Sequence, residues 1–231
     1  NVASASADHV DLAALARLAA FLPFDARSRQ LLVDYAPQGL LRGVSAKWKG
    51  AVEGLQSYAL KAAFSDVGVK ANGVFPGCSG LDGTLDANQS GGRVALDAGR
   101  STIDLPGVFP VSLTTLDKLV AQVKWTVDSD GVDVDLTRVD FSAPDAAGTA
   151  QGRYHSRSGG PGEIDLTASL SRADARAVWR YMPHVVGQGA RDWLRDSLLA
   201  GRASEAKLIL KGDRADFPFL DKARGQFLGT V

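Results

Sequence analysis

The sequence predicts a mainly β protein: one long antiparallel meander, curled into a gutter or a sandwich, with two short helix pairs. Apolar and polar residues alternate with a period of two over most of residues 41–170, as in strands with one apolar face. Helical spacing is confined to residues 1–40 and 171–231, and 25 glycines and nine prolines divide the chain into short elements. We therefore expect a helical pair that starts a repeat unit at 1–40, a curled sheet at 41–170, and a second helical pair with the start of the next sheet segment at 171–231.

Two short helices are expected in the first segment. Leucines recur at helical spacing after Asp11, the expected N-cap, and the first helix ends before Pro23. The second helix is expected at Ala26–Tyr35, closed by Pro37 and Gly39.

Short strands follow from Leu41 onward. The alternation changes parity between Phe64 and Val67, which predicts a bulge or turn. The strands expected in this part lie at residues 44–49, 58–64, 67–71, 81–87, 94–98 and 102–105.

The strongest hairpin signal joins Leu119–Val127 to Val132–Phe141 through the sequence Asp-Ser-Asp-Gly at 128–131, because Asp-Gly favours a tight hairpin turn. Arg138 interrupts the apolar pattern of the second strand, which resumes with changed parity. Further strands are expected at 148–154 and 164–170, on either side of a mobile Ser-, Gly- and Pro-rich loop at 155–162.

The last segment begins with Ser171-Arg172-Ala173-Asp174, which has the pattern of a capping box and predicts a helix ended by Pro183. A further helix is expected at Ala190–Leu199, with Gly201 just beyond its end. Strands are expected at 205–211 and 223–230.

An internal repeat relates the two helical segments. Leu15–Pro23 resembles Ala175–Pro183, and Gly39–Gly50 resembles Gly201–Gly212. The unit is helix, proline, helix, glycine and strand, followed by a long sheet before the unit recurs. This pattern predicts an elongated protein built by stacking, of which the sequence spans about one module and a fraction.

The predicted sheet needs a cover for its apolar face. About ten strands with one apolar face must be covered by a second sheet, by helices or by a ligand. Four short helices are too few, so we expect the sheet to fold over itself as a sandwich, barrel or gutter. Alanine, glycine and valine are common on the inward parity, which favours an interior with room for a ligand.

Composition excludes several classes of function. The 26 basic residues balance 26 acidic ones, so no net field attracts nucleic acid. No run approaches the roughly 20 apolar residues of a membrane span, and no signal peptide is evident. Because the chain begins at Asn1, we expect a processed protein or a piece of a larger one. Cys78 has no cysteine partner and lies in a turn-like Pro-Gly-Cys-Ser-Gly sequence.

No motif for catalysis, a metal or a cofactor is found. His9, His155 and His184 are far apart and have no metal-ligand spacing. The aspartates around Asp128 and Asp130 lack the glycine spacing and the bidentate glutamate of a calcium loop. Neither a phosphate-binding Gly-Lys-Ser/Thr sequence nor a Gly-x-Ser-x-Gly sequence occurs. We therefore expect neither an enzyme nor a bound cofactor.

Three stretches resemble a known family. They are Leu116–Trp125, which leads to the hairpin at 130–131, then Gly162–Ala168, and, most specifically, Trp193 through Gly201 to Phe219. In these stretches the chain is similar to the large AsmA-like envelope proteins of Gram-negative bacteria, and among them to the YhdP type. The similarity extends over most of the chain.

The resemblance implies an inner-membrane-anchored protein that spans the periplasm and whose sheet curls into a long apolar gutter. Members of the family look like conduits that carry phospholipid toward the outer membrane. The partners implied are phospholipid acyl chains, neighbouring repeats of the same chain, and the inner membrane, reached through an anchor outside this sequence. The family supplies no catalytic residues.

We expect acyl chains to lie along the inward apolar residues, with head groups in water at the open edge. The candidate lining residues are Val94, Leu96, Ile103, Leu105, Val123, Trp125, Val134, Leu136, Ile164, Leu166, Leu208 and Leu210.

Two alternatives remain open at this point. One is a non-catalytic architectural module of the cell envelope with a packed core, which binds partners through its edge strands. The other is a carbohydrate-binding sandwich, which needs exposed aromatic platforms. Trp48 and Trp125 lie on the apolar parity of strands, and Trp179 and Trp193 lie on helices, so core packing is favoured for them. An open apolar channel, a packed interior or exposed aromatic side chains distinguishes the three hypotheses.

Overall fold

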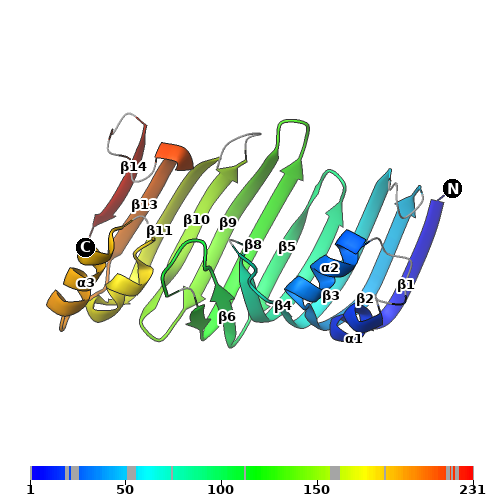
Figure 1. Cartoon of the computed structure of the whole chain (residues 1–231), viewed down its shortest axis with the longest axis horizontal. Helices are drawn as coiled ribbons and strands as arrows, with labels where there is room; N and C mark the ends of the chain where they lie inside the picture. Colours follow the sequence, from blue (N-terminus) through cyan, green and yellow to red (C-terminus); the bar gives the residue numbers. More distant parts are fainter. Residues whose placement is uncertain are drawn as a thin grey trace.

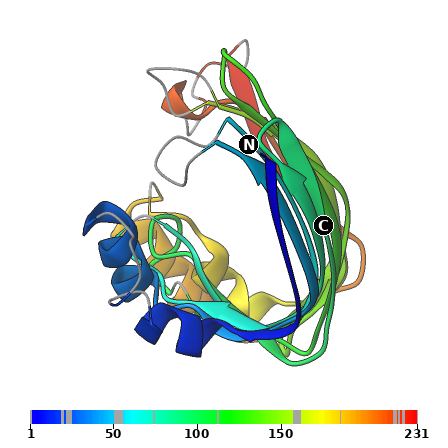
Figure 2. The same ribbon diagram turned by 90° about the vertical axis from the view of Figure 1, so that its right-hand side faces the viewer.

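The computed structural model describes residues 2–18, 21, 26–50, 56–73, 75–111, 113–156, 162–184, 186–216, 219, 221 and 224–230. In this part of the chain, fourteen strands form one antiparallel sheet, so the expected mainly β fold is confirmed. The two ends of the sheet do not pair with each other. The sheet curls into a C-shaped cross-section, so of the sandwich, the barrel and the gutter the chain forms the gutter (Figure 2).

One helical pair precedes β2, and another precedes the short strand β12 and β13. The strands are β1 (Val2–Asp11), β2 (Gln38–Lys49), β3 (Ser57–Val69), β4 (Gly77–Asn88), β5 (Gly91–Ala98), β6 (Ser101–Asp104), β7 (Leu113–Leu116), β8 (Lys118–Val127), β9 (Val132–Ser142), β10 (Ala146–His155), β11 (Glu163–Asp174), β12 (Arg202–Ala203), β13 (Ala206–Asp213) and β14 (Gly225–Thr230). The helices are α1 (Leu12–Leu18), α2 (Ala26–Tyr35), the 3-10 helices η3 (Ala175–Tyr181) and η4 (Arg214–Asp216), and α3 (Gln188–Ser197).

The gutter has two different lips (Figure 1). Neighbours run in the order β1-β2-β3-β4-β5-β8-β9-β10-β11-β13-β14, while β6 and β7 form a side hairpin on β4. We call the edge that carries α1, α2, the β6–β7 hairpin, η3 and α3 the helix lip. The opposite edge, formed by the turns after β4, β8 and β13, is the hairpin lip.

The buried core is small and lies near the helix lip. Five residues from β5, β7, β8 and the turn after β9 form it, and Ile103 and Phe141 pack against them. The buried members are Ala98, Leu116, Leu119, Ala121 and Ala143. The β6–β7 hairpin therefore covers only one end of the apolar face, and in the described part of the chain the large side chains on the rest of that face are only half-buried.

Backbone irregularities lie where the sequence predicts them. The pairing of β3 with β4 shifts register between Phe64 and Val67, as the change of parity indicated. The pairing of β8 with β9 shifts so that Gln122 faces Arg138 while Val123 faces Leu136. The predicted hairpin between β8 and β9 is confirmed, and the Asp128 carboxylate accepts hydrogen bonds from the backbone amides of the turn.

Some expectations differ from the structure. Residues 2–11 form strand β1, which the sequence reading missed, and the short strands β7 and β12 were also not expected. The capping-box prediction was wrong in detail, because Ser171 and Arg172 continue strand β11 and Asp174 is the N-cap of η3. Pro23 and residues 157–161 of the predicted loop lie outside the described residues.

The two copies of the repeat adopt the same architecture. In each copy a strand ends at an aspartate that caps a helix, and a second helix and a glycine lead into the antiparallel partner strand. Gly39 and Gly201 both have positive φ, and so do Gly50 and Gly212. The strand registers also correspond: Val2↔Lys49, Ala7↔Val44 and Asp11↔Leu40 in the first copy match Asp165↔Lys211, Leu170↔Ala206 and Asp174↔Arg202 in the second.

Candidate functional site

The candidate site is the concave face of the sheet, where three rows of small and apolar residues cross the strands. We call these rows the concave floor. The first row is Ala5, Ala46, Leu60, Ala87, Gly92, Trp125, Val134, Tyr154, Ile164, Gly212 and Gly225. The second row is Ala62, Leu85, Val94, Val123, Leu136, Gly152, Leu166, Leu210 and Phe227. The third row is Phe64, Gly83, Leu96, Ala121, Val139, Ala150, Ala168, Leu208 and Gly229.

Ten of the twelve candidate lining residues lie in the concave floor. Alternation within each strand and antiparallel pairing between strands place them on one face. The two exceptions are Ile103 and Leu105. Ile103 lies in β6 and packs against the buried core, whereas Leu105 follows β6 and its carbonyl accepts hydrogen bonds from the amides of Val108 and Phe109.

Sequence reading missed several floor residues. Leu60, Phe64 and Leu85 extend the floor toward β3 and β4, and Tyr154 and Phe227 extend it over β10 and β14. The alternation in each of these strands carried the signal, since each residue lies on the same parity as its apolar neighbours. The order in which the strands pair was also needed, because only this order places residues of separate strands in one continuous row.

The concave floor is open to solvent. All large floor side chains are half-buried, and Leu116, Leu119 and Phe219 are the only large apolar side chains that are fully buried among the described residues. The chain exposes 14422 Å², whereas a compact protein of this mass exposes about 10,000 Å². The face is therefore a half-covered apolar surface and not the interior of a packed core.

Glycines flatten the floor beside its aromatic side chains. A Cβ on Gly92 would lie 2.5 Å from Cζ2 of Trp125, and a Cβ on Gly83 would lie 2.9 Å from Cζ of Phe64. The aromatic rings therefore lie over the neighbouring glycines along the sheet. Glycine at these positions provides the space that such a close approach requires.

The convex face of the sheet is polar and charged. A row of charged residues crosses the strands, and apart from Arg93 opposite Lys124 its neighbours have opposite sign, which stabilises cross-strand pairs. The Asp86 carboxylate lies 3.2 Å from Nζ of Lys61 and 3.1 Å from Nη2 of Arg93, and these cations lower its pKa. The row is Lys61, Asp86, Arg93, Lys124, Asp135, Arg153, Asp165 and Lys211. Water therefore solvates one face of the sheet and is disfavoured on the other.

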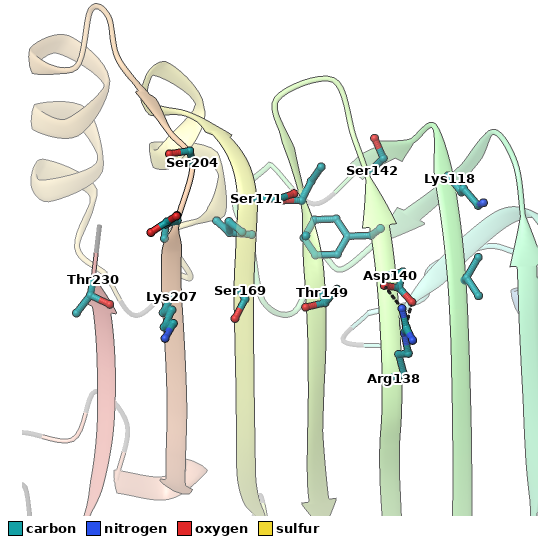
Figure 3. A pocket seen from close by; sticks show the side chains of 17 residues that line it. Lys118, Arg138, Asp140, Ser142, Thr149, Ser169, Ser171, Ser204, Lys207 and Thr230 are labelled. Carbon is teal, nitrogen blue, oxygen red and sulfur yellow. Dashed lines mark hydrogen bonds and ion pairs between the residues drawn. The ribbon is translucent and has the colours of Figure 1, made fainter.

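A hollow of about 1060 Å³ lies over the polar side of β8–β11 and β13 (Figure 3). Its wall includes Thr149, Ser169 and Lys207, which succeed one another across the strands on the parity opposite to the floor. Arg138 and Asp140 form an ion pair at 2.6 Å in the same hollow, and this pair lowers the pKa of the Asp140 carboxyl. Val120, Phe141 and Leu170 also line this hollow, so its wall is mixed, in contrast to the uniformly apolar floor.

No metal-binding cluster accompanies the floor in the described part of the chain. No group of three or more metal-ligating side chains occurs there. His155 contacts Asp133 at 2.7 Å on the convex side, and burial raises the pKa of the Cys78 thiol. None of the described helices has the length and apolarity needed to span a bilayer.

The floor is long compared with a lipid chain. Eleven strands lie side by side along the gutter, and at about 4.8 Å per strand this spans roughly 48 Å. An acyl chain spans one leaflet, which is half of the roughly 30 Å hydrocarbon core of a bilayer. The gutter can therefore hold acyl chains along its axis without a deep pocket for any one of them.

Comparison with known proteins identifies the family. The family model described as YhdP protein matches residues 3–231. Comparison with the curated proteins and with the solved structures gives no match. Because the family model covers nearly the whole chain, the chain belongs to the YhdP family, as the sequence resemblance indicated.

Proposed function

We propose that this member of the YhdP family is a segment of a lipid-transfer conduit of the cell envelope, whose concave floor holds phospholipid acyl chains. The observation that carries the proposal is the continuous, half-exposed apolar floor described above. A surface of this size is unfavourable in water, because exposed apolar area costs about 25 cal/mol per Å². Acyl chains are elongated and purely apolar, and they match its shape and its chemistry.

The geometry favours sliding over tight capture. Among the described residues, the three rows of the floor contain no charged side chain that would fix one lipid, and aromatic rings lie close beside Gly92 and Gly83. An acyl chain loses its contact with water anywhere along the gutter. Its head group stays hydrated at the open mouth between the helix lip and the hairpin lip.

The proposal also includes the assembly of the conduit and its location in the cell envelope. Strands β1 and β14 are the two ends of the sheet, so neighbouring repeats can extend the gutter at either end by strand pairing. We propose that the assembled conduit lies in the periplasm, is tethered to the inner membrane through an anchor outside this chain, and carries phospholipid between inner and outer membrane. No catalytic role and no cofactor are proposed.

The architectural alternative is less well supported. A module with a packed core would bury its large apolar side chains. Here Leu136, Leu166 and Leu210 lie side by side along the second row, with only Gly152 between the first two, and all remain half-buried. A carbohydrate site is less well supported, because Trp125 lies on the floor and Trp48 lies on the same face of β2 as Ala46. The core packing expected for Trp193 is wrong, because this side chain is 65% exposed on α3.

The test measures lipid on the protein before any detergent is used. The chain is purified without detergent, examined by native mass spectrometry and lipid extraction, and titrated with a fluorescent acyl probe. We expect co-purified phospholipid that the probe displaces. A lipid-free protein that also fails to bind the probe would contradict the proposal.

A matched pair of variants locates the binding surface. Leu136→Asp places a charge on the floor between Val123 and Gly152, and we expect a folded protein whose affinity for the probe falls about tenfold or more. The control is Thr137→Asp, at the next residue, which is exposed in the β9 bulge, and it should bind normally. Equal probe binding by both variants would place the lipid elsewhere.

A further inference from the structure

The concave face ends at the hairpin lip in a row of side chains that differs from the floor. We call it the lip row. Its members lie two residues beyond the first floor row and therefore on the same face of each strand. The strands remain paired through this row: Trp48 pairs with Tyr58, and the Arg214 amide donates to the Gly162 carbonyl at 2.9 Å. The polar and aromatic side chains of the lip row are Trp48, Tyr58, Gln89, Ser90, Ser156 and Arg214.

The composition of the lip row is that of a boundary between an apolar surface and water. Trp48 is half-buried and Tyr58 is 41% exposed. Such rings have an apolar body and a polar tip, so they suit a site where one end is apolar and the other is wet. The hairpin lip also borders the open side of the C-shaped cross-section (Figure 2). This row is therefore the place where a bound lipid would change from acyl chain to head group.

Arg214 supplies the positive charge of this boundary. It is the one charged side chain of the lip row in the described part of the chain. Its guanidinium carbon lies 6.0 Å from the centroid of the Tyr154 ring, which belongs to the first floor row. The neighbouring carboxylates have other partners, since Asp213 accepts from a backbone amide of η4 and Asp216 pairs with Arg224 at 3.1 Å. A cation is thus held directly beside the apolar floor.

The opposite side of the floor offers no comparable boundary on β8. There the floor runs under the β6–β7 hairpin, where Ala121 and Leu119 are 4% and 5% exposed. Six residues separate Val127, in the lip row, from Ala121, which is roughly 20 Å at about 3.3 Å per residue. An acyl chain that spans one leaflet is about 15 Å long. A lipid with its head group at the lip row therefore has room for its chains before the covered core begins.

We infer that a carried phospholipid lies across the gutter in one orientation, with its phosphate bound by Arg214 and its acyl chains directed over the floor toward the helix lip. The planar fork of a guanidinium can donate two parallel hydrogen bonds to a phosphate, while its face stacks on an aromatic ring. Arg214 is exposed, so the bound phosphate stays hydrated and the lipid can exchange. The inference rests on the proposed function and adds to it the recognised group and the direction of the lipid.

The test compares two fluorescent lipids with identical acyl chains, a phosphatidic acid and a diacylglycerol, which differ only in the phosphate. We expect the 231-residue chain to bind the phosphatidic acid about tenfold more tightly, because hydrogen bonds to a charged group add affinity. Arg214→Gln should reduce this difference to less than about threefold and leave the affinity for diacylglycerol unchanged. The control is Arg153→Gln, because Arg153 precedes Tyr154 in β10 and lies on the convex face. This variant should keep the tenfold difference.

The outcomes separate this inference from the proposed function. Equal affinity of the natural chain for the two lipids overturns the inference, and so does an equal change in the two variants. Inorganic phosphate is the third ligand, and if it binds at Arg214 while the two lipids bind equally, the residue takes a free anion and the inference fails. In these cases diacylglycerol still binds and the proposed function stands. Failure of both lipids to bind contradicts the proposed function and the inference together.

The orientation of the lipid is measured without any substitution. Two phospholipids, one with a photoreactive head group and one with a photoreactive group at the end of a chain, are cross-linked to the natural protein and mapped by mass spectrometry. We expect the head-group label near Ser156 and Arg214, and the chain-end label near Ala150 and Ala168 in the third floor row. The reverse pattern, or the same pattern for both lipids, overturns the inference.

Discussion

The two ends of the same strands behave differently. On β5 and β8, Ala98 and Leu119 are 0% and 5% exposed beneath the β6–β7 hairpin. A few residues away on the same face, Val94 and Val123 are half-buried on the open floor. One alternating pattern therefore gives a buried core where the β6–β7 hairpin covers the sheet and an open apolar surface where no described segment covers it.

The largest effect should come from a truncation in the covered part. Leu119→Ala removes a buried side chain from the core and leaves a cavity, so we expect the free energy of unfolding to fall by about 2–5 kcal/mol. Urea denaturation measures the change. The matched variant Val123→Ala, on the open floor of the same strand, should cost about 1 kcal/mol. Similar losses for the two variants would remove the distinction between the two regions.

A smaller effect is expected where the floor packs against its own backbone. Gly92→Ala places a methyl group against the Trp125 indole and 2.7 Å from the Asp86 carbonyl oxygen, so we expect a loss of about 1–3 kcal/mol. Trp125 must move, so its fluorescence should change and binding of the acyl probe should weaken. Gly99→Ala is the control, because no atom lies within 4 Å of a Cβ at that position. An unchanged emission spectrum in Gly92→Ala would mean that the ring does not lie over Gly92.

The smallest effect concerns the exposed ion pair that fixes η3 at the helix lip. Hydrogen bonds from the Arg176 side chain and backbone lower the pKa of Asp174 from 3.8 to about 2. A lowered pKa in the folded state stabilises that state above pH 4, and the stabilisation is lost as the pH falls toward 2. We expect the fluorescence of Trp179, which lies in η3, to change over this window at constant fold.

Asp174→Asn supplies the control for this titration. The variant keeps a side-chain acceptor at the N-cap but has no group that titrates there. Its fluorescence should show no transition between pH 4 and 2. A transition that persists in the variant would show that Asp174 is not the group that titrates.

The concave floor could largely be predicted from alternation alone. Residues such as Leu136 and Leu166 lie where parity placed them, because side chains of a strand alternate strictly between its two faces. Ile103 and Leu105 were misplaced because β6 leaves the main path of the sheet and belongs to the side hairpin, a choice that depends on pairing over long distances. Strand β1 was missed because its run of alanines and serines has little intrinsic preference for a strand.

The sequence by itself determined most of the strands and their turns, the internal repeat and the parity of the apolar face, since these depend on residues close together in the chain. Tertiary structure decided that the sheet stays open. A sandwich, a barrel and a gutter require the same alternation, and they differ only in which strands meet and how strongly the sheet bends. It also decided which apolar residues the β6–β7 hairpin covers. That choice separates Leu119 in the core from Leu136 on the open floor, although both residues satisfy the same local pattern.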